Sequence, residues 1–266
     1  MPVFLPKNAN TKKKMEKIFR IKRFDPEKEK EKDILAFGWE EFTVELDPFE
    51  RLLDGLIKIK ETQDGTLTFR RSCAHGMCGS CAMKINGKNA LACQTLARNT
   101  PELIVLEPLP AMPVIKDLVV DMDPFFEKLS GVMPWFLEDG PPPERERLQS
   151  PEELEQILDA IKCIMCGCCT SSCPVYWSDR DYLGPAALVK AARFILDSRD
   201  AAWKERFLTV SGENGLWRCH SIYNCYEVCP RSIDVTGNIS RLKRLAVKRL
   251  FPFLSSKRKG REGEAG

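Results

Sequence analysis

Cysteine is the residue whose placement most constrains the fold of this chain. The 266 residues contain 12 cysteines in three groups: Cys73, Cys78, Cys81 and Cys93, then Cys163, Cys166, Cys168, Cys169 and Cys173, then Cys219, Cys225 and Cys229. Thiolates spaced in this way are ligands of iron–sulfur clusters. Several clusters in a row can carry electrons, so the fold must bring each group of thiols together.

The last two groups belong to a repeated motif. Bacterial-type ferredoxins carry C-x2-C-x2-C-x3-C-P twice, and the fourth cysteine of each copy binds the cluster of the other copy. Residues 163–174 complete the motif, whereas residues 219–230 have Ile222 at the second ligand position. The crossover predicts a 4Fe-4S cluster on one set of thiols and a second cluster on the other: Cys163, Cys166, Cys169 and Cys229, and Cys173, Cys219 and Cys225.

Ile222 predicts a different cluster type for the second set. A cubane that lacks one protein ligand tends to lose that iron, so three thiols predict a 3Fe-4S cluster. Fewer thiolates also mean less negative charge, which favours the reduced form and raises the potential. This cluster is therefore expected to be the last acceptor in the row.

The first group has the spacing C-x4-C-x2-C-x11-C, which predicts a 2Fe-2S cluster on Cys73, Cys78, Cys81 and Cys93. Gly76 and Gly79 lie between these cysteines, where a loop that wraps a cluster often needs positive φ. Cys168 has no place in the three ligand sets and is expected to be a buried bystander.

Zinc sites and disulfides are the alternatives to iron. Paired C-x2-C motifs also bind structural zinc, which would make the chain a zinc-structured adaptor. Zinc needs four ligands in a closed tetrahedron, and it gives the two C-x3-C-P endings no role. Residues 1–14 lack the apolar stretch of a signal peptide, so the cysteines are expected to stay reduced.

The two halves of the chain predict an α+β fold. In the first half, alternating residues predict strands at 17–24, 41–46, 66–69, 82–85 and 103–106, with a helix at 52–60 and a tight turn at Asn86-Gly87. This is the pattern of a β-grasp ferredoxin domain. Residues 116–150 are expected to be a connection with an extended proline run at 141–143.

The second half predicts an all-α bacterial-type ferredoxin domain. Ser150, Pro151 and Glu153 predict a capped helix start, and apolar residues follow at helical spacing: Leu154, Ile157, Leu158 and Ile161. Further helices are expected at 185–197 and 239–250. The predicted domains are an N-terminal extension (1–16), a β-grasp 2Fe-2S domain (17–115), a linker (116–150), an α-helical ferredoxin domain (151–250) and a basic tail (251–266).

Composition excludes several other classes of protein. A net charge of +3 gives no indication of nucleic-acid binding. No apolar run approaches the length of a membrane span. The sequence has no nucleophile beside a base and no nucleotide-binding glycine loop. We therefore expect the chain to transfer electrons and not to make or break bonds in a substrate.

Six short segments are more specific than the cysteine spacing: residues 67–73 (LTFRRSC), 78–83 (CGSCAM), 116–122 (KDLVVDM), 182–186 (YLGPA), 197–200 (DSRD) and 218–222 (RCHSI). With these segments, residues 17–250 resemble the iron-sulfur subunit of succinate dehydrogenase and quinol:fumarate reductase, the complex II family. The resemblance implies a β-grasp domain followed by an α-helical ferredoxin domain, with the ligand sets given above.

The resemblance also implies partners. A flavoprotein subunit with covalently bound FAD would supply electrons, cytochrome b-type membrane subunits with haem b would anchor the chain, and quinone would accept the electrons. The lysine-rich start at 12–14 lacks the arginine and serine content and the amphipathic stretch of a transit peptide, so the chain is expected to be bacterial or archaeal and to lie at the cytoplasmic face of the plasma membrane. It would serve the respiratory chain and the tricarboxylic acid cycle as part of a succinate:quinone oxidoreductase. The alternative is the same electron path in reverse, in a quinol:fumarate reductase.

The segment after the first C-P motif departs from the family. Many members have serine, an aromatic residue and two tryptophans there, whereas this chain has Val175-Tyr176-Trp177-Ser178. Val175 lacks the hydroxyl of the serine, and Ser178 stands where the second tryptophan is found. The quinone pocket is therefore expected to differ in shape, to take a different quinone, or to lie within the membrane subunits.

Four residues remain as candidates near the quinone: Pro174, Trp177, His220 and Ile222. His220 is expected either to stabilise a reduced oxygen or relay a proton, or to hydrogen-bond cluster sulfur or backbone. Trp177 is expected at a membrane interface or in packing. His75, in the first cysteine loop, is expected to be exposed.

Overall fold

The computed structural model describes residues 14–27, 37–141 and 143–250. The chain forms two compact units: unit 1 is Met1–Pro108 with Val114–Val120, and unit 2 is Leu109–Pro113 with Asp121–Gly266. The predicted basic tail and most of the predicted N-terminal extension lie outside the described residues. Within the described ranges, no helix combines the length and the apolar character that crossing a bilayer requires.

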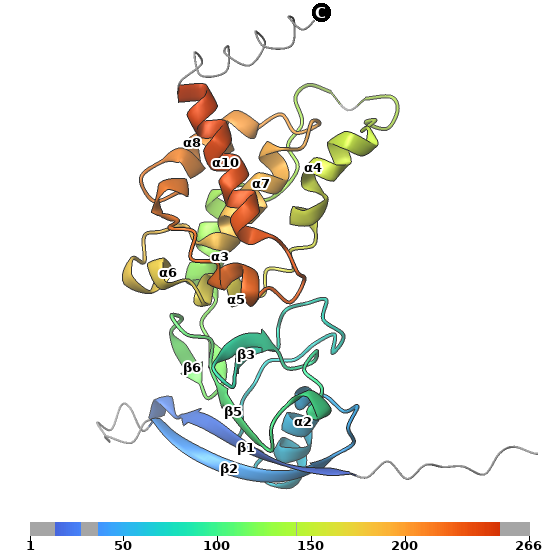
Figure 1. The fold of residues 1–266 in the computed structure, drawn as a ribbon, viewed down its shortest axis with the longest axis vertical. Helices are drawn as coiled ribbons and strands as arrows, with labels where there is room; N and C mark the ends of the chain where they lie inside the picture. The colour runs from blue at the N-terminus through green and yellow to red at the C-terminus, as the bar shows by residue number, and fades with distance from the viewer. Residues whose placement is uncertain (1–13, 28–36, 142, 251–266) are drawn as a thin grey trace, which may run out of the picture. The chain divides into compact units, whose positions relative to one another are not determined.

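Unit 1 is built on a five-stranded mixed sheet of order β2-β1-β5-β3-β4 (Figure 1). Its strands are β1 (Met15–Phe24), β2 (Phe37–Leu46), β3 (Ala82–Ile85), β4 (Lys88–Leu91) and β5 (Leu103–Glu107). β1 pairs antiparallel with β2 and parallel with β5, and β3 pairs antiparallel with β4 and β5. Four of the five predicted strands are therefore confirmed, and the predicted turn at Asn86-Gly87 joins β3 to β4 with φ of 47° and 83°.

Helix α2 (Leu52–Thr62) confirms the helix predicted at 52–60 and supplies much of the core of unit 1. Leu52, Leu56 and Ile59 are fully buried, and full burial of such side chains contributes roughly 1.5–3 kcal/mol each. Gly55 faces Phe19 of β1, where an added Cβ would lie 2.4 Å from the ring. The absence of a side chain at position 55 therefore lets the helix lie close against the sheet.

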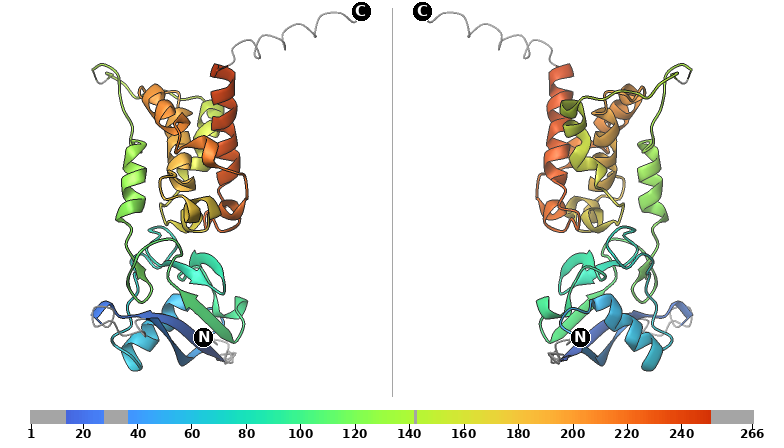
Figure 2. Two further views of the ribbon diagram at one scale, coloured as in Figure 1. Left: turned by 90° about the vertical axis from the view of Figure 1, so that its left-hand side faces the viewer. Right: turned by 90° about the vertical axis from the view of Figure 1, so that its right-hand side faces the viewer.

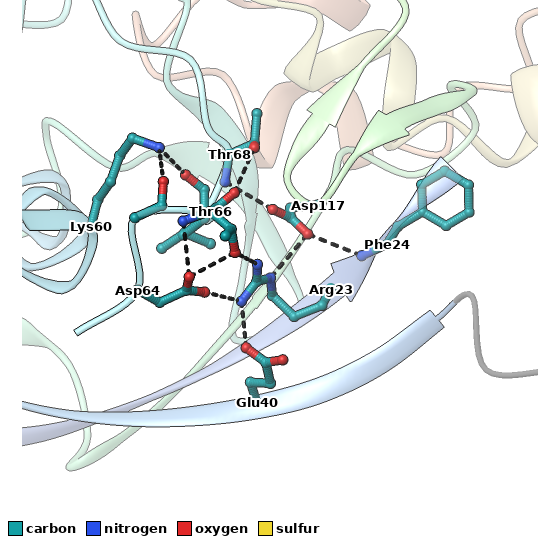
Figure 3. Close-up of polar contacts among 10 residues, drawn as sticks. Arg23, Phe24, Glu40, Lys60, Asp64, Thr66, Thr68 and Asp117 are labelled. Carbon is teal, nitrogen blue, oxygen red and sulfur yellow. Dashed lines mark hydrogen bonds and ion pairs between the residues drawn. The ribbon is translucent and has the colours of Figure 1, made fainter. Parts of the chain in front are cut away.

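The predicted strand at 66–69 is wrong. Side chains form hydrogen bonds with backbone groups in and next to this segment (Figure 3). Lys60 Nζ donates to the carbonyls of Gly65 and Leu67 at 2.9 and 2.7 Å. Asp117 Oδ2 accepts the Thr68 N–H at 2.8 Å. These bonds replace a strand ladder, although the alternation of apolar and polar residues favoured one.

Asp117 is the centre of this polar network. It lies in the turn between β6 (Val114–Lys116) and β7 (Val119–Val120), and its residue is 2% exposed. Besides Thr68, its carboxylate accepts the Phe24 N–H at 3.1 Å and Arg23 Nε at 2.9 Å. Arg23 also pairs with Glu40 and Asp64. The β6–β7 pair therefore belongs to unit 1, and the 3-10 turn η1 (Ala97–Asn99) completes this unit.

Unit 2 is helical and centres on α7 (Pro185–Ile195), which packs against α3, α4, α5, α8 and α10. The longest helix, α10 (Val235–Leu250), runs beside α7 (Figure 2). The other elements are α3 (Asp123–Gly131), α4 (Pro151–Ile161), α5 (Cys168–Ser171), α6 (Pro174–Ser178), α8 (Trp203–Ser211), η2 (Leu216–Arg218) and α9 (Asn224–Glu227). The α+β fold class is thus confirmed.

The start of α4 has the predicted capping box. Ser150 Oγ accepts the Glu153 N–H at 3.2 Å, and Glu153 Oε2 accepts the Ser150 N–H at 2.9 Å. Only Ile157 of the predicted apolar stripe is fully buried, whereas Leu154 and Leu158 are 41% and 50% exposed. Helical spacing therefore identified the helix but not the side that packs.

The predicted connection at 116–150 contains more structure than expected. It includes α3, whose Phe125 and Leu129 are buried, a pattern too short to stand out in the sequence. Arg206 of α8 is fully buried and donates to the carbonyls of Met133 and Trp135 at 2.9 and 2.6 Å, and it also pairs with Asp200. Part of the connection is therefore held firmly on unit 2.

We predict that Asp117→Ala destabilises unit 1 by about 3 kcal/mol, because the buried Phe24 N–H and the partly buried Thr68 N–H lose their acceptor and the Arg23 guanidinium loses one of its three carboxylate partners. Urea unfolding of the full-length chain, followed by circular dichroism, measures the effect. The matched control is Glu40→Ala, which removes a half-exposed partner of the same Arg23 and should cost less than about 1 kcal/mol. Equal losses in the two variants would contradict a central role for Asp117.

Candidate metal centres

The loop before β3 surrounds the sulfur of Cys73 with backbone donors. The N–H groups of His75, Met77 and Cys78 point at Cys73 Sγ from 3.4, 3.3 and 3.4 Å. The hydrogen bonds from His75 and Met77 lower the pKa of Cys73 to about 6. A loop that stabilises a thiolate in this way is prepared to bind a metal, because the thiolate is the ligand form of cysteine.

The shape of this loop depends on its glycines. Gly76 and Gly79 have φ of 79° and 74°, as the sequence predicted, and His75 is exposed, also as predicted. A Cβ at Gly76 would lie 2.8 Å from the side chain of Gln94. The loop therefore folds closely onto the segment that carries Cys93.

Two further cysteines of the group, Cys81 and Cys93, are buried, whereas Cys78 is exposed. Cys93 donates its N–H to Cys81 Sγ at 3.4 Å, and burial raises the pKa of Cys81 to about 12. The N-terminus of α2 holds the segment around Cys93, because Leu52 N–H donates to Thr95 O and Leu53 N–H to Ala92 O at 2.9 and 3.1 Å. Elements of unit 1 thus place all four cysteines of the first group at one site.

The two motifs of unit 2 share one backbone conformation. Met165 and Ser221 occupy equivalent positions, and both have φ of 55°. Gly167 and Tyr223, equivalent in the same way, have φ of 78° and 71° and each precede a short helix, α5 or α9. The repeat seen in the sequence is therefore a structural repeat, although only one copy has glycine at the left-handed position.

The thiols of unit 2 gather in the sets that the crossover rule predicts. One pocket is lined by Cys163, Cys166, Cys169 and Cys229, and a separate one by Cys173, Cys219 and Cys225. Burial raises the pKa of Cys163, which also interacts electrostatically with Cys166 and Cys229. Burial likewise raises the pKa of Cys225, which interacts with Cys173 and Cys219.

A lysine holds the first cysteine of each motif. Lys190 of α7 donates to the carbonyl of Cys163 at 3.1 Å, and Lys243 of α10 donates to the carbonyl of Cys219 at 2.6 Å. Both ammonium groups bring positive charge next to a set of thiols, where it would stabilise anionic sulfur. In the sequence, Lys243 is one of many basic residues near the C-terminus, and nothing distinguishes it.

The spacing of the thiols in these pockets is compatible with clusters. Across the described part of the chain, no three side chains of metal-binding type converge tightly enough to hold one ion. A cluster does not need such convergence, because its thiolates bind different iron atoms. Tyr182 supports this fit: it is fully buried and lines the pocket of Cys173, and its hydroxyl has no hydrogen-bond partner among the described residues.

Cys168 lies apart from both sets. It is fully buried, and its thiol hydrogen-bonds the sulfur of Cys166, which lowers the pKa of Cys166. It does not line either pocket. This position suits a residue that packs beside the ligand Cys166 and does not itself bind a cluster.

Three of the four quinone-proximal candidates line the pocket of the three thiols: Pro174, His220 and Ile222. His220 is exposed, and its ring makes no hydrogen bond within the part of the chain that the structure describes. Trp177 does not line this pocket. Its indole N–H donates to the carbonyl of Ser171 at 2.7 Å, and its residue is 48% exposed.

Comparison with known proteins places both units in known families. Residues 18–127 match the family described as "2Fe-2S iron-sulfur cluster binding domain", and residues 159–233 match the "4Fe-4S dicluster domain". The chain is 44% identical over 244 residues to "Succinate dehydrogenase [ubiquinone] iron-sulfur subunit 1, mitochondrial" of Oryza sativa subsp. japonica, covering 90% of this chain and 84% of that protein. It is 42% identical over 226 residues to "Succinate dehydrogenase iron-sulfur subunit" of Coxiella burnetii, covering 85% and 94%.

Among solved structures, a chain of the "Mycobacterium smegmatis Sdh1 complex in the apo form" has a similar fold. Its TM-score is 0.79 at 28% identity, and the match covers 90% of this chain and 98% of that chain. The similarity therefore extends over both units and is not confined to the cysteine motifs.

We predict that Cys168→Ala leaves the iron and sulfide content of the purified chain unchanged, whereas Cys169→Ala removes at least one cluster. The two residues are adjacent, but only Cys169 lines a pocket with the other thiols. Iron and acid-labile sulfide assays, with the absorption spectrum, measure the difference. Iron loss in Cys168→Ala equal to that in Cys169→Ala would show that our ligand set is wrong.

Proposed function

The chain belongs to the family of succinate dehydrogenase iron-sulfur subunits, and from that premise we propose that it carries electrons through a succinate:quinone oxidoreductase. The resemblance found in the sequence is thereby confirmed. The observation that carries the proposal is the division of the thiols into three separate sets, one in unit 1 and two in unit 2. Three sets of this kind suit a row of electron carriers.

The residues that would hold the three clusters are those predicted from the sequence. Unit 1 would hold a 2Fe-2S cluster on Cys73, Cys78, Cys81 and Cys93. Unit 2 would hold a 4Fe-4S cluster on Cys163, Cys166, Cys169 and Cys229, and a 3Fe-4S cluster on Cys173, Cys219 and Cys225. When bound, these clusters supply one-electron carriers.

The protein itself sets the charge and the packing around each carrier. Backbone N–H groups of the first loop stabilise the sulfur of Cys73, and Lys190 and Lys243 bring positive charge to the two sets of unit 2. Ile222, which is 49% exposed, lies at the edge of the pocket with three thiols and offers no ligand atom. This supports a cluster with one iron fewer at that site.

Electrons would enter from a flavoprotein subunit with covalent FAD and leave to quinone. Membrane subunits of the cytochrome b type, with haem b, would anchor the chain at the cytoplasmic face of a bacterial or archaeal plasma membrane. The relatives named above are succinate dehydrogenases, which favours succinate oxidation over fumarate reduction. Pro174, His220 and Ile222 would lie nearest the quinone, with Trp177 on the adjoining surface.

We predict that the purified chain is brown and gives EPR signals from a reduced 2Fe-2S cluster and from an oxidised 3Fe-4S cluster. Both signals follow from the ligand sets, because each set fixes the number of irons. Spectra of air-oxidised and dithionite-reduced samples measure them. A colourless protein with bound zinc would refute the proposal, and two complete cubanes in unit 2 would refute the assignment at Ile222.

We predict that Ile222→Cys converts the three-thiol site to a 4Fe-4S site. The new thiolate supplies the missing ligand, and its negative charge lowers the potential. Iron analysis should show one additional iron per chain, and the oxidised 3Fe-4S signal should disappear. The control Ile222→Val adds no ligand and should keep that signal, so its loss in both variants would indicate damage to the site.

A further inference from the structure

The pocket of Cys173, Cys219 and Cys225 contains two buried hydroxyls that play no part in the ligand sets. One belongs to Thr236, in the first turn of α10, which is 2% exposed. Its Oγ1 lies 3.5 Å from Cys225 Sγ, the one hydrogen-bond partner that the described residues offer it. A thiolate bound to iron has no proton, so the hydroxyl must be the donor.

The second hydroxyl belongs to Tyr182, in the loop before α7. Its side chain is fully buried and lines the same pocket, and it interacts electrostatically with Cys219 and Cys173. Its oxygen has no hydrogen-bond partner in the described ranges. Leaving a buried hydroxyl without a hydrogen bond is unfavourable, so a sulfur acceptor in the pocket would remove this cost.

The other pocket of unit 2 lacks such groups. Apart from its cysteines and Arg231, it is lined by glycine, proline and apolar residues, with no hydroxyl side chain: Ile164, Met165, Gly167, Ala186, Val189, Pro230, Ile233 and Val235. The sulfur of Cys229 receives a backbone donor there, the Ile233 N–H at 3.4 Å. The two pockets share a backbone repeat but differ in their hydroxyl donors.

We propose that Tyr182 and Thr236 are positioning residues that donate hydrogen bonds to the sulfur atoms of the three-thiol site and thereby raise its reduction potential. The inference rests on the proposed function. A cluster held there would gain one negative charge as a whole when it accepts an electron, and no covalent bond would form or break. Because hydrogen bonds to sulfur favour the more negative state, both hydroxyls make this site a better final acceptor.

Two variants remove the hydroxyls with little change of shape: Tyr182→Phe and Thr236→Val. In membranes that carry the assembled complex, redox titration followed by EPR measures the midpoint potential of the 3Fe-4S signal. Each variant should make reduction of this site about three- to tenfold less favourable; for one electron, tenfold corresponds to about 59 mV. The potentials of the other two clusters should not change, and they report on folding.

Thr236→Ser keeps a hydroxyl and should keep the potential of the unaltered chain. Tyr176→Phe is the matched control for the ring, because Tyr176 is also buried but its hydroxyl hydrogen-bonds Arg180. Unchanged potentials in Tyr182→Phe and Thr236→Val, or an equal shift in Thr236→Ser, would overturn the inference. Absence of a 3Fe-4S signal from the unaltered chain would instead refute the proposed function. If Thr236→Val fails to assemble, Tyr182→Phe decides the outcome.

Discussion

In unit 2, the fourth cysteine of each motif lies in the thiol set of the other motif, and the fold of the helical unit depends on this crossover. Cys229 must reach the set that begins at Cys163, and Cys173 must reach the set of Cys219. Helices α7 and α8 lie between the two motifs in the chain, so they must fold back and bring the motifs together. Packing of α7 against α4, α8 and α10 is therefore also the step that assembles both sites.

Polar side chains that appear unremarkable in the sequence fix the loops around this frame. Asp117 joins β1, the 66–68 segment and the β6–β7 turn in unit 1. In unit 2, Arg206 holds the connection and the two lysines hold the first cysteine of each motif. Because these charges are paired or hydrogen-bonded, their burial does not carry the large penalty of an isolated charge.

The repeat in unit 2 also combines similar backbones with different pocket linings. Both copies place a left-handed residue before a short helix, and both receive a lysine. They differ in the side chains that line the pockets: one has four thiols and no hydroxyl, and the other has three thiols and two buried hydroxyls. Fewer thiolate ligands and more hydrogen-bond donors would both raise the reduction potential of a cluster bound in the second pocket.

The sequence by itself determined the features that depend on local spacing. The cysteine motifs, the capping box of α4, the positive φ of Gly76 and Gly79 and most strands and helices could all be predicted, because each depends on neighbours within a few residues. Only the tertiary structure decided which apolar side of α4 is buried, that Asp117 replaces a strand at 66–69, and that Tyr182 and Thr236 meet the thiols. Those contacts join residues far apart in the chain, and no local pattern records them.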